Sequence, residues 1–95
     1  MALFNLQGRW LQGNLEINIV MNTADEFNIK ALSAELQKYW QAGYGTVHQS
    51  GKFEVTLSNR TADGHVQDGH IQGYVTADGK SMHFNNGVIW ILQHH

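Results

Sequence analysis

The sequence of 95 residues contains no cysteine and carries little charge. Without thiols the chain has no disulfide framework, no thiolate zinc site and no thiol nucleophile. Six basic and eight acidic residues give a formal net charge of -2, with 15% of the residues charged. So weak a balance leaves no basic surface for nucleic acid or for an anionic membrane. We therefore expect neither as a partner.

Targeting signals are lacking as well. The first ten residues have neither a basic stretch nor a long apolar one, so they do not resemble a signal peptide. No apolar run in the chain is long enough to span a bilayer. We expect a cytoplasmic protein, although a secreted chain whose leader was removed would look the same. His94 and His95 resemble a purification-tag remnant or a tail, and we expect no functional role for them.

What the chain does have is apolar and amide side chains. Hydrophobic residues make up 42% of it, with three Trp, three Tyr and four Phe, which suffices for one globular core. Chains this short rarely divide, so residues 1–95 are expected to form a single domain. Amide side chains hydrogen-bond regardless of pH, which suits neutral polar ligands or subunit contacts. Because weak charge does not oppose self-association, we expect a homo-oligomer.

The first twenty residues predict a hairpin. A two-residue turn at Gly13-Asn14 pairs Trp10 with Ile17 and Gly8 with Ile19, which places the large apolar residues on one face. Gly8-Arg9-Trp10 is similar to the Gly-x-Trp motif of lipocalins. That resemblance covers three residues, and the helix expected after the second strand departs from the uninterrupted strand meander of that family, so the predicted fold is not taken from it.

Residues 24–42 predict one amphipathic helix. Thr23 and Glu26 have the spacing of a capping box. Apolar residues follow at intervals of roughly three and four, as on one face of a helix. These residues are Phe27, Ile29, Leu32, Leu36, Tyr39 and Trp40.

From Gly45 onward the chain predicts strands. A three-residue loop at 50–52 pairs Val47 with Val55 and sets His48 opposite Glu54. The tetrapeptide Thr-Ala-Asp-Gly at 61–64 and 76–79 predicts two Asp-Gly hairpin turns. Between them, a β-bulge with Gly69 in the left-handed region would return the following residues to the inner face.

The last strands predict a candidate binding face. A two-residue turn at Asp78-Gly79 pairs Tyr74 with His83, and a second such turn at Asn86-Gly87 pairs His83 with Trp90. All three rings then share the face opposite the apolar core, where aromatic faces can stack on a ligand ring while imidazole and amides bind its polar edge. The predicted ligand- or partner-binding residues are Tyr74, His83, Trp90, Gln72, Asn85 and Ser81. A second small core or a subunit interface would have the same composition.

Other chemistry has weaker support. His65, Asp68 and His70 lie close together in the sequence, but two histidines on a turn rarely complete a zinc site. No nucleophile elbow, phosphate loop or dinucleotide motif is present. We therefore expect no metal, no cofactor and no assigned catalytic residue.

Together these patterns predict an α+β fold of order ββαβββββ, a twisted and mostly antiparallel sheet, curled toward a half-barrel, with one helix packed on it. We expect a non-catalytic module that binds a partner subunit or a neutral polar ligand such as a saccharide. Two alternatives stay open: a small acid–base enzyme with a pocket between helix and sheet, using His48 or His83, and a structural subunit that pairs through exposed edge strands.

Overall fold

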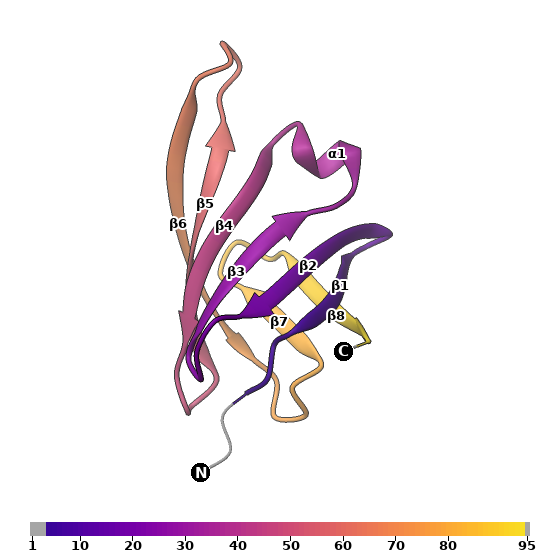
Figure 1. Cartoon of the computed structure of the whole chain (residues 1–95), viewed down its shortest axis with the longest axis vertical. Helices are drawn as coiled ribbons and strands as arrows, with labels where there is room; N and C mark the ends of the chain where they lie inside the picture. The colour runs from indigo at the N-terminus through magenta and orange to yellow at the C-terminus, as the bar shows by residue number, and fades with distance from the viewer. Residues whose placement is uncertain (1–3, 95) are drawn as a thin grey trace.

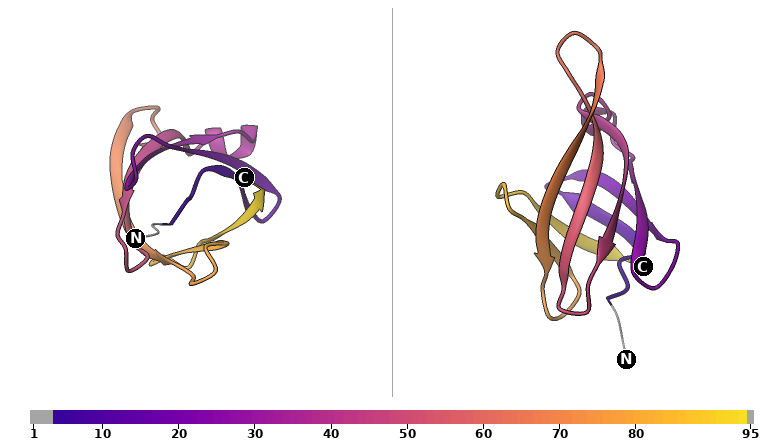
Figure 2. Two further views of the ribbon diagram at one scale, coloured as in Figure 1. Left: turned by 60° about the horizontal axis from the view of Figure 1, so that its bottom comes forward. Right: turned by 90° about the vertical axis from the view of Figure 1, so that its left-hand side faces the viewer.

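The computed structural model describes residues 4–94 and, of these, the side chains of residues 4–93 (Figure 1). The elements are β1 Gly8–Gln12, β2 Leu15–Met21, β3 Glu26–Ala31, α1 Ala34–Gln37, β4 Trp40–Val47, β5 Lys52–Arg60, β6 Val66–Val75, β7 Ser81–Phe84 and β8 Ile89–His94. Each strand pairs with the next, and β8 returns to β1, so the eight strands form a closed antiparallel barrel. The ring of strands is visible in the left view of Figure 2.

The predicted α+β fold is therefore wrong. Residues 24–42 form no long helix; they contain β3, the four-residue α1 and the start of β4. Phe27, Ile29 and Ala31 alternate strictly with exposed residues, and all three are buried. Their spacing of two places them on the inner face of a strand, because successive side chains of a strand point to opposite sides.

The capping-box residues serve a turn instead of a helix. Thr23 Oγ1 accepts the backbone N–H of Glu26 at 3.1 Å, which is the bond expected at a helix start. Here the chain reverses: the N–H of Asn22 donates to the Glu26 carbonyl at 2.8 Å and closes the connection from β2 to β3. The predicted hydroxyl bond forms, but the helix that it was expected to start does not, because such bonds stabilise turns as well as helix ends.

The first hairpin is confirmed, with Trp10 paired with Ile17 and Gly8 with Ile19. Trp10 is fully buried, and its indole N–H donates to the Leu6 carbonyl at 2.8 Å. Since β3 pairs with both β2 and β4, the strand meander continues where a helix was expected.

Two details of the middle strands differ from expectation. Val47 faces Phe53 and Thr46 faces Glu54, a shift of two residues that keeps the same side chains inside. The predicted bulge is absent, because β5 and β6 pair without interruption from Lys52↔Tyr74 to Arg60↔Val66. The bulge was expected to bring the residues on both sides of Gly69 to the inner face. Without it, Val66 points outward and is 65% exposed.

Both Thr-Ala-Asp-Gly segments form hairpin turns, with Gly64 and Gly79 at φ +89° and +72°. Neither is a two-residue turn, because the Thr61 N–H donates to the His65 carbonyl at 2.8 Å and the Thr76 N–H to the Ser81 carbonyl at 3.0 Å. The second loop still gives the predicted pairing of Tyr74 with His83. In each turn the threonine hydroxyl donates to the aspartate carboxylate, Thr61 to Asp63 and Thr76 to Asp78. These hydroxyl bonds are the main reason that the pKa of each aspartate lies below its ordinary value.

Strands β5 and β6 are longer than their neighbours and extend past the barrel as a two-stranded arm (Figures 1 and 2). The molecule consequently measures 45 Å along its longest axis, against 24 and 23 Å across it. The described part of the chain has no helix long and apolar enough to cross a lipid bilayer.

Candidate functional site

Tyr74 and His83 are paired on the outer surface, as predicted. Their rings stack with centroids 5.1 Å apart and planes 10° from parallel. Tyr74 is 54% exposed, and His83 is half-buried beside it. The turn at Asp78-Gly79 was thus sufficient to fix this register.

Trp90 does not join them. The turn between β7 and β8 is one residue wider than predicted: Phe84 N–H donates to the Val88 carbonyl at 2.9 Å, and Gly87 adopts φ +91°. Asn86 stabilises this shape by accepting the N–H of Val88 at 3.0 Å. Met82 therefore faces Trp90 and His83 faces Ile89. A shift of one residue turns every side chain of β8 to the other face, so Trp90 lies inside the barrel and is 1% exposed.

The other predicted site residues remain outside. Gln72 donates its amide to the Glu54 carboxylate at 3.3 Å. Ser81 is half-buried and its N–H donates to Thr76 Oγ1 at 3.2 Å, while Asn85 is exposed. The outer row of cross-strand neighbours is consequently Tyr74, His83 and Ile89. It has no exposed tryptophan face.

Three further histidines, His48, His65 and His70, lie apart from one another on the surface. His48 is exposed in the β4–β5 turn and is not opposite Glu54. His65 pairs with Asp63 at 2.9 Å, and His70 Nδ1 lies 2.9 Å from Thr56 Oγ1. In the part of the chain that the structure describes, no three His, Asp or Glu side chains gather as metal ligands would.

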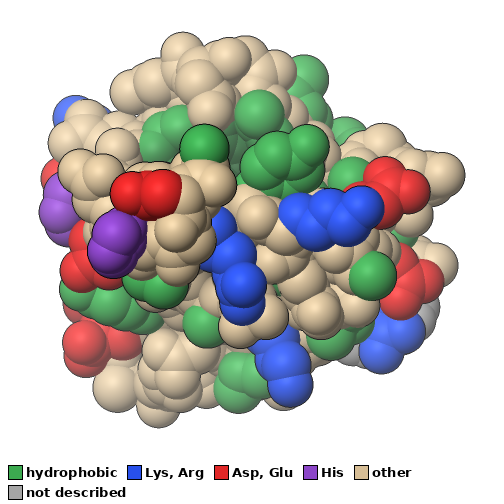
Figure 3. Space-filling model, turned by 90° about the horizontal axis from the view of Figure 1, so that it is seen from above, with side chains coloured by type: hydrophobic (Ala, Val, Ile, Leu, Met, Phe, Trp, Pro, Cys, Tyr) green, Lys and Arg blue, Asp and Glu red, His purple; other side chains and the backbone are tan. Residues whose placement is uncertain are grey.

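A pocket that the sequence did not predict lies at the end of the barrel next to α1. Its volume is about 390 Å³, and its lining comes from both ends of the chain and from the middle. We call it the mouth pocket. Leu36, Leu57 and Val88 contribute apolar side chains to it; Gln12, Asn59 and Asn86 contribute amides. Figure 3 looks onto this end of the molecule and shows apolar side chains exposed between polar ones.

Two tryptophans line the mouth pocket. Trp40 and Trp90 stack with centroids 5.9 Å apart and planes 22° from parallel, and Phe84 tilts against Trp90 at 4.5 Å. Trp40 is 6% exposed, so both indoles are almost fully enclosed. The pairing became possible because the wider β7–β8 turn brought Trp90 inside.

The two indole N–H groups differ. Trp90 Nε1 donates to Gln12 Oε1 at 2.9 Å. The Trp40 indole N–H has no acceptor among residues 4–93. In the same part of the chain, every side-chain N or O atom that is shielded from solvent has a hydrogen-bond partner. The nitrogen of Trp40 is therefore open to solvent, and Trp40 lines the mouth pocket, where an acceptor can reach it. No Asp, Glu, Lys or Arg is part of the described lining, so the site suits uncharged ligands.

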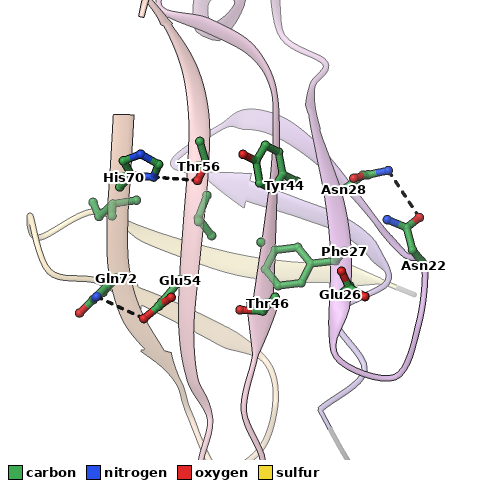
Figure 4. Close-up of a pocket in the computed structure, with 13 residues that line it drawn as sticks. Asn22, Glu26, Phe27, Asn28, Tyr44, Thr46, Glu54, Thr56, His70 and Gln72 are labelled. Carbon is green, nitrogen blue, oxygen red and sulfur yellow. Dashed lines mark hydrogen bonds between the residues drawn. The ribbon is translucent and has the colours of Figure 1, made fainter. Parts of the chain in front are cut away.

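A second hollow lies on the outer surface of β3, β4, β5 and β6 (Figure 4). It has a volume of about 530 Å³ and is built from two cross-strand rows of outward side chains. The rows are Asn28-Tyr44-Thr56-His70 and Glu26-Thr46-Glu54-Gln72. Tyr44, 58% exposed, offers an aromatic face.

Several polar groups of this outer hollow are already bonded to one another. Gln72 binds Glu54, His70 lies against Thr56, and Asn28 donates to Asn22 at 3.4 Å. A ligand would have to replace these bonds, which lowers its net gain in free energy. The mouth pocket is the stronger candidate because its Trp40 N–H has no protein partner to lose.

Comparison of this chain with protein-family models, with curated proteins and with solved structures gives no match.

Proposed function

We propose that this protein is a non-catalytic binding module that takes a small neutral ligand in the mouth pocket. The observation that carries the proposal is the nearly buried Trp40, whose indole N–H has no acceptor in the described chain. The indole nitrogen meets solvent at the pocket, so a ligand acceptor there exchanges a bond to water for a bond to the ligand, with a net gain of about 0.5–1.5 kcal/mol. A ligand acceptor that bonds this N–H therefore gains more binding free energy than one that has to replace an existing hydrogen bond within the protein.

The chemistry of the lining defines the ligand class. Barrel mouths commonly hold small molecules, and pockets of roughly 300–1,000 Å³ suit them; this pocket is at the small end at about 390 Å³. Apolar walls favour a ligand with one apolar ring face, while amides and the indole N–H favour neutral oxygen or nitrogen acceptors. A mono- or disaccharide, or a neutral heterocycle of similar size, has both features.

The enzyme alternative has less support. It required a pocket between a long helix and the sheet, and residues 24–42 form no such helix. His48 and His83, the two bases considered, do not line the mouth pocket. A binding function needs neither of them.

Titration of the protein with a panel of neutral saccharides and heterocycles, followed by NMR of the indole N–H signals, tests the proposal. We expect a ligand of the right class to shift the Trp40 indole proton and the methyl groups of Leu57 and Val88. Trp40→Phe keeps a ring but removes the N–H, so affinity should fall by about 2- to 12-fold, the equivalent of one neutral hydrogen bond.

Tyr74→Ala provides the matched control, because it removes an aromatic ring from the outer surface without touching the mouth pocket. Its affinity for the same ligand should equal that of the wild type. Shifts confined to Tyr74 and His83, or to Tyr44 in the outer hollow, would contradict the proposal, as would a complete panel without shifts at the mouth.

A further inference from the structure

Among residues 4–94, no strand pairs with the N-terminal half of the β6 edge that faces away from β5. In the β5–β6 ladder the odd-numbered residues exchange hydrogen bonds with β5. Two bonds at the ends of the ladder establish this phase: Val75 N–H donates to the Gly51 carbonyl at 2.7 Å, and Thr61 N–H to the His65 carbonyl at 2.8 Å. The even-numbered residues of β6 therefore direct their N–H and C=O groups to the opposite side.

At its C-terminal end this opposite side is occupied by β7 and the turn that follows. Thr76 N–H donates to the Ser81 carbonyl at 3.0 Å, and Asn85 N–H donates to the Gln72 carbonyl at 2.9 Å. Beyond Asn85 the chain turns back toward β8. Within residues 4–94, β7 pairs only with Gly73, Tyr74 and Val75 of β6. The backbone groups of Val66, Asp68 and His70 thus form a free strand edge on the arm.

We propose that this edge pairs with the same edge of a second copy of the chain, as antiparallel strands related by a two-fold axis at Gly69. In this register Asp68 lies opposite His70 of the partner subunit, and His70 lies opposite Asp68 of the partner subunit. The backbone N–H and C=O groups of Asp68 and His70 in the two copies then form four hydrogen bonds across the axis.

Charge complementarity selects this register. Antiparallel pairing requires even-numbered residues to face even-numbered ones, so the two-fold axis can fall at Gln67, Asp68, Gly69 or His70. An axis at Gln67 would set the Asp68 carboxylate opposite the apolar side chain of Val66 of the partner subunit. An axis at Asp68 would set two carboxylates directly opposite, which is destabilising. An axis at His70 would set the imidazoles opposite and would require the Gln72 carbonyl, which already accepts from Asn85.

The side chains fit the same register. Asp68 and His70 are exposed on the outer face of β6, and His70 Nδ1 is engaged by Thr56 Oγ1 at 2.9 Å. Its Nε2 is therefore the atom that can meet the Asp68 carboxylate of the partner subunit. Gly69, on the axis, presents no side chain that would separate the two strands. The arm projects from the barrel, so the second copy can approach its edge (Figure 2).

The alternative role of Asp68 is protective, since a charge on an edge strand discourages pairing with other chains. The two roles predict opposite results. Analytical ultracentrifugation across a concentration series should show reversible association to twice the 10.7 kDa of one chain. A single species at the monomer mass at all concentrations overturns the proposal, and so does an assembly larger than a dimer.

A proline substitution tests the edge directly. Asp68→Pro removes an N–H that faces the free edge and leaves the ladder to β5 intact, so the monomer should fold normally. We expect its dimerisation constant to weaken by at least tenfold. Asp68→Asn, the matched control, keeps the N–H and a hydrogen-bonding side chain, and its dimer should weaken by only a few-fold. Equal dimerisation of Asp68→Pro and wild type would overturn the proposal.

A charge exchange tests the register. Asp68→Lys and His70→Glu should each impair association, since each sets like charges or unmatched groups across the axis. The double variant places Lys opposite Glu and should restore association to near the wild-type level. Failure of the double variant to recover, with the barrel still folded by circular dichroism, would contradict the register with Asp68 opposite His70 of the partner subunit.

Discussion

The indole of Trp90 stacks on the indole of Trp40 inside the barrel, with ring centroids 5.9 Å apart. One belongs to the last strand and the other to the first residue of β4. This contact joins distant parts of the chain and at the same time lines the mouth pocket. Stability and the proposed binding function therefore share a residue pair.

Trp90→Ala should lower the free energy of unfolding by about 3–5 kcal/mol, because it removes a fully enclosed aromatic side chain. Urea denaturation monitored by circular dichroism measures the change. Tyr74→Ala, which truncates an exposed ring, should cost less than about 1.5 kcal/mol. If the two variants lost similar stability, the placement of Trp90 inside the barrel would be wrong. Trp90→Phe gives a milder variant if the alanine protein does not fold.

Gly73→Ala should destabilise the barrel by about 1–3 kcal/mol, because core overpacking of one methyl group costs this much. A Cβ at this position would overlap the His83 carbonyl and lie 2.6 Å from Phe53 Cζ. Gly13→Asn is the control: its φ of +64° suits asparagine, and no atom lies within 4 Å. Thermal unfolding should separate the two variants clearly; equal melting temperatures would mean that β7 can shift to accommodate the methyl.

Ala34→Pro distinguishes the short α1 from the long helix that the sequence suggested. Ala34 is the first residue of α1, and Ser33 before it is extended at φ -75° and ψ 134°. Proline is tolerated at a first helical position after an extended residue, so stability should change by less than about 1 kcal/mol. In the middle of a helix spanning 24–42 the same change would cost about 3 kcal/mol.

Lys30→Pro is the counterpart within β3. Lys30 pairs with Asn18 on one side and Ala42 on the other, so a proline there removes a ladder hydrogen bond in a central strand. We expect this variant to be largely unfolded by far-ultraviolet circular dichroism. A well-folded Lys30→Pro protein would contradict the assignment of β3.

Thr76→Val should raise the pKa of Asp78 toward its ordinary value, because the Thr76 hydroxyl bond is the main cause of the lowered pKa. The sign of the effect on stability follows. A carboxyl whose pKa is lower in the folded state stabilises the fold above its unfolded pKa, near 3.8, and loses this contribution as the pH falls through the folded pKa.

Carboxyl NMR titration measures the change in both turns at once. Asp63, whose pKa is lowered by Thr61 in the same way, is an internal control and should titrate as in the wild type. Thr76→Ser retains the hydroxyl and should leave the pKa of Asp78 low. An unchanged Asp78 titration in Thr76→Val would show that the hydroxyl bond does not set this pKa.

The hairpins that close within a few residues could be predicted. Trp10 faces Ile17 and Tyr74 faces His83 because the turns at Gly13-Asn14 and Asp78-Gly79 set the register by their own backbone geometry. The outer part of the candidate face followed from the second of these turns. The position of Trp90 could not be predicted, because Asn86-Gly87 suits both a two-residue and a three-residue turn.

The helix prediction failed for a physical reason. Residues 34–38 favour a helix locally, and the wider apolar pattern matches a helical stripe at several positions. The same pattern contains Phe27, Ile29 and Ala31 at strand spacing. In the folded chain β3 and β4 fill the gap between β2 and β5, and their ladders satisfy edges that a helix would leave open.

The sequence by itself determined local events: the two-residue turn at Gly13-Asn14, the pairing of Tyr74 with His83, and the absence of thiols. Tertiary structure decided that the sheet closes, that Trp90 meets Trp40, and that the edge of β6 stays free. These outcomes depend on pairing between segments far apart in the chain. Local conformational preferences of less than about 1 kcal/mol per residue cannot specify such pairing.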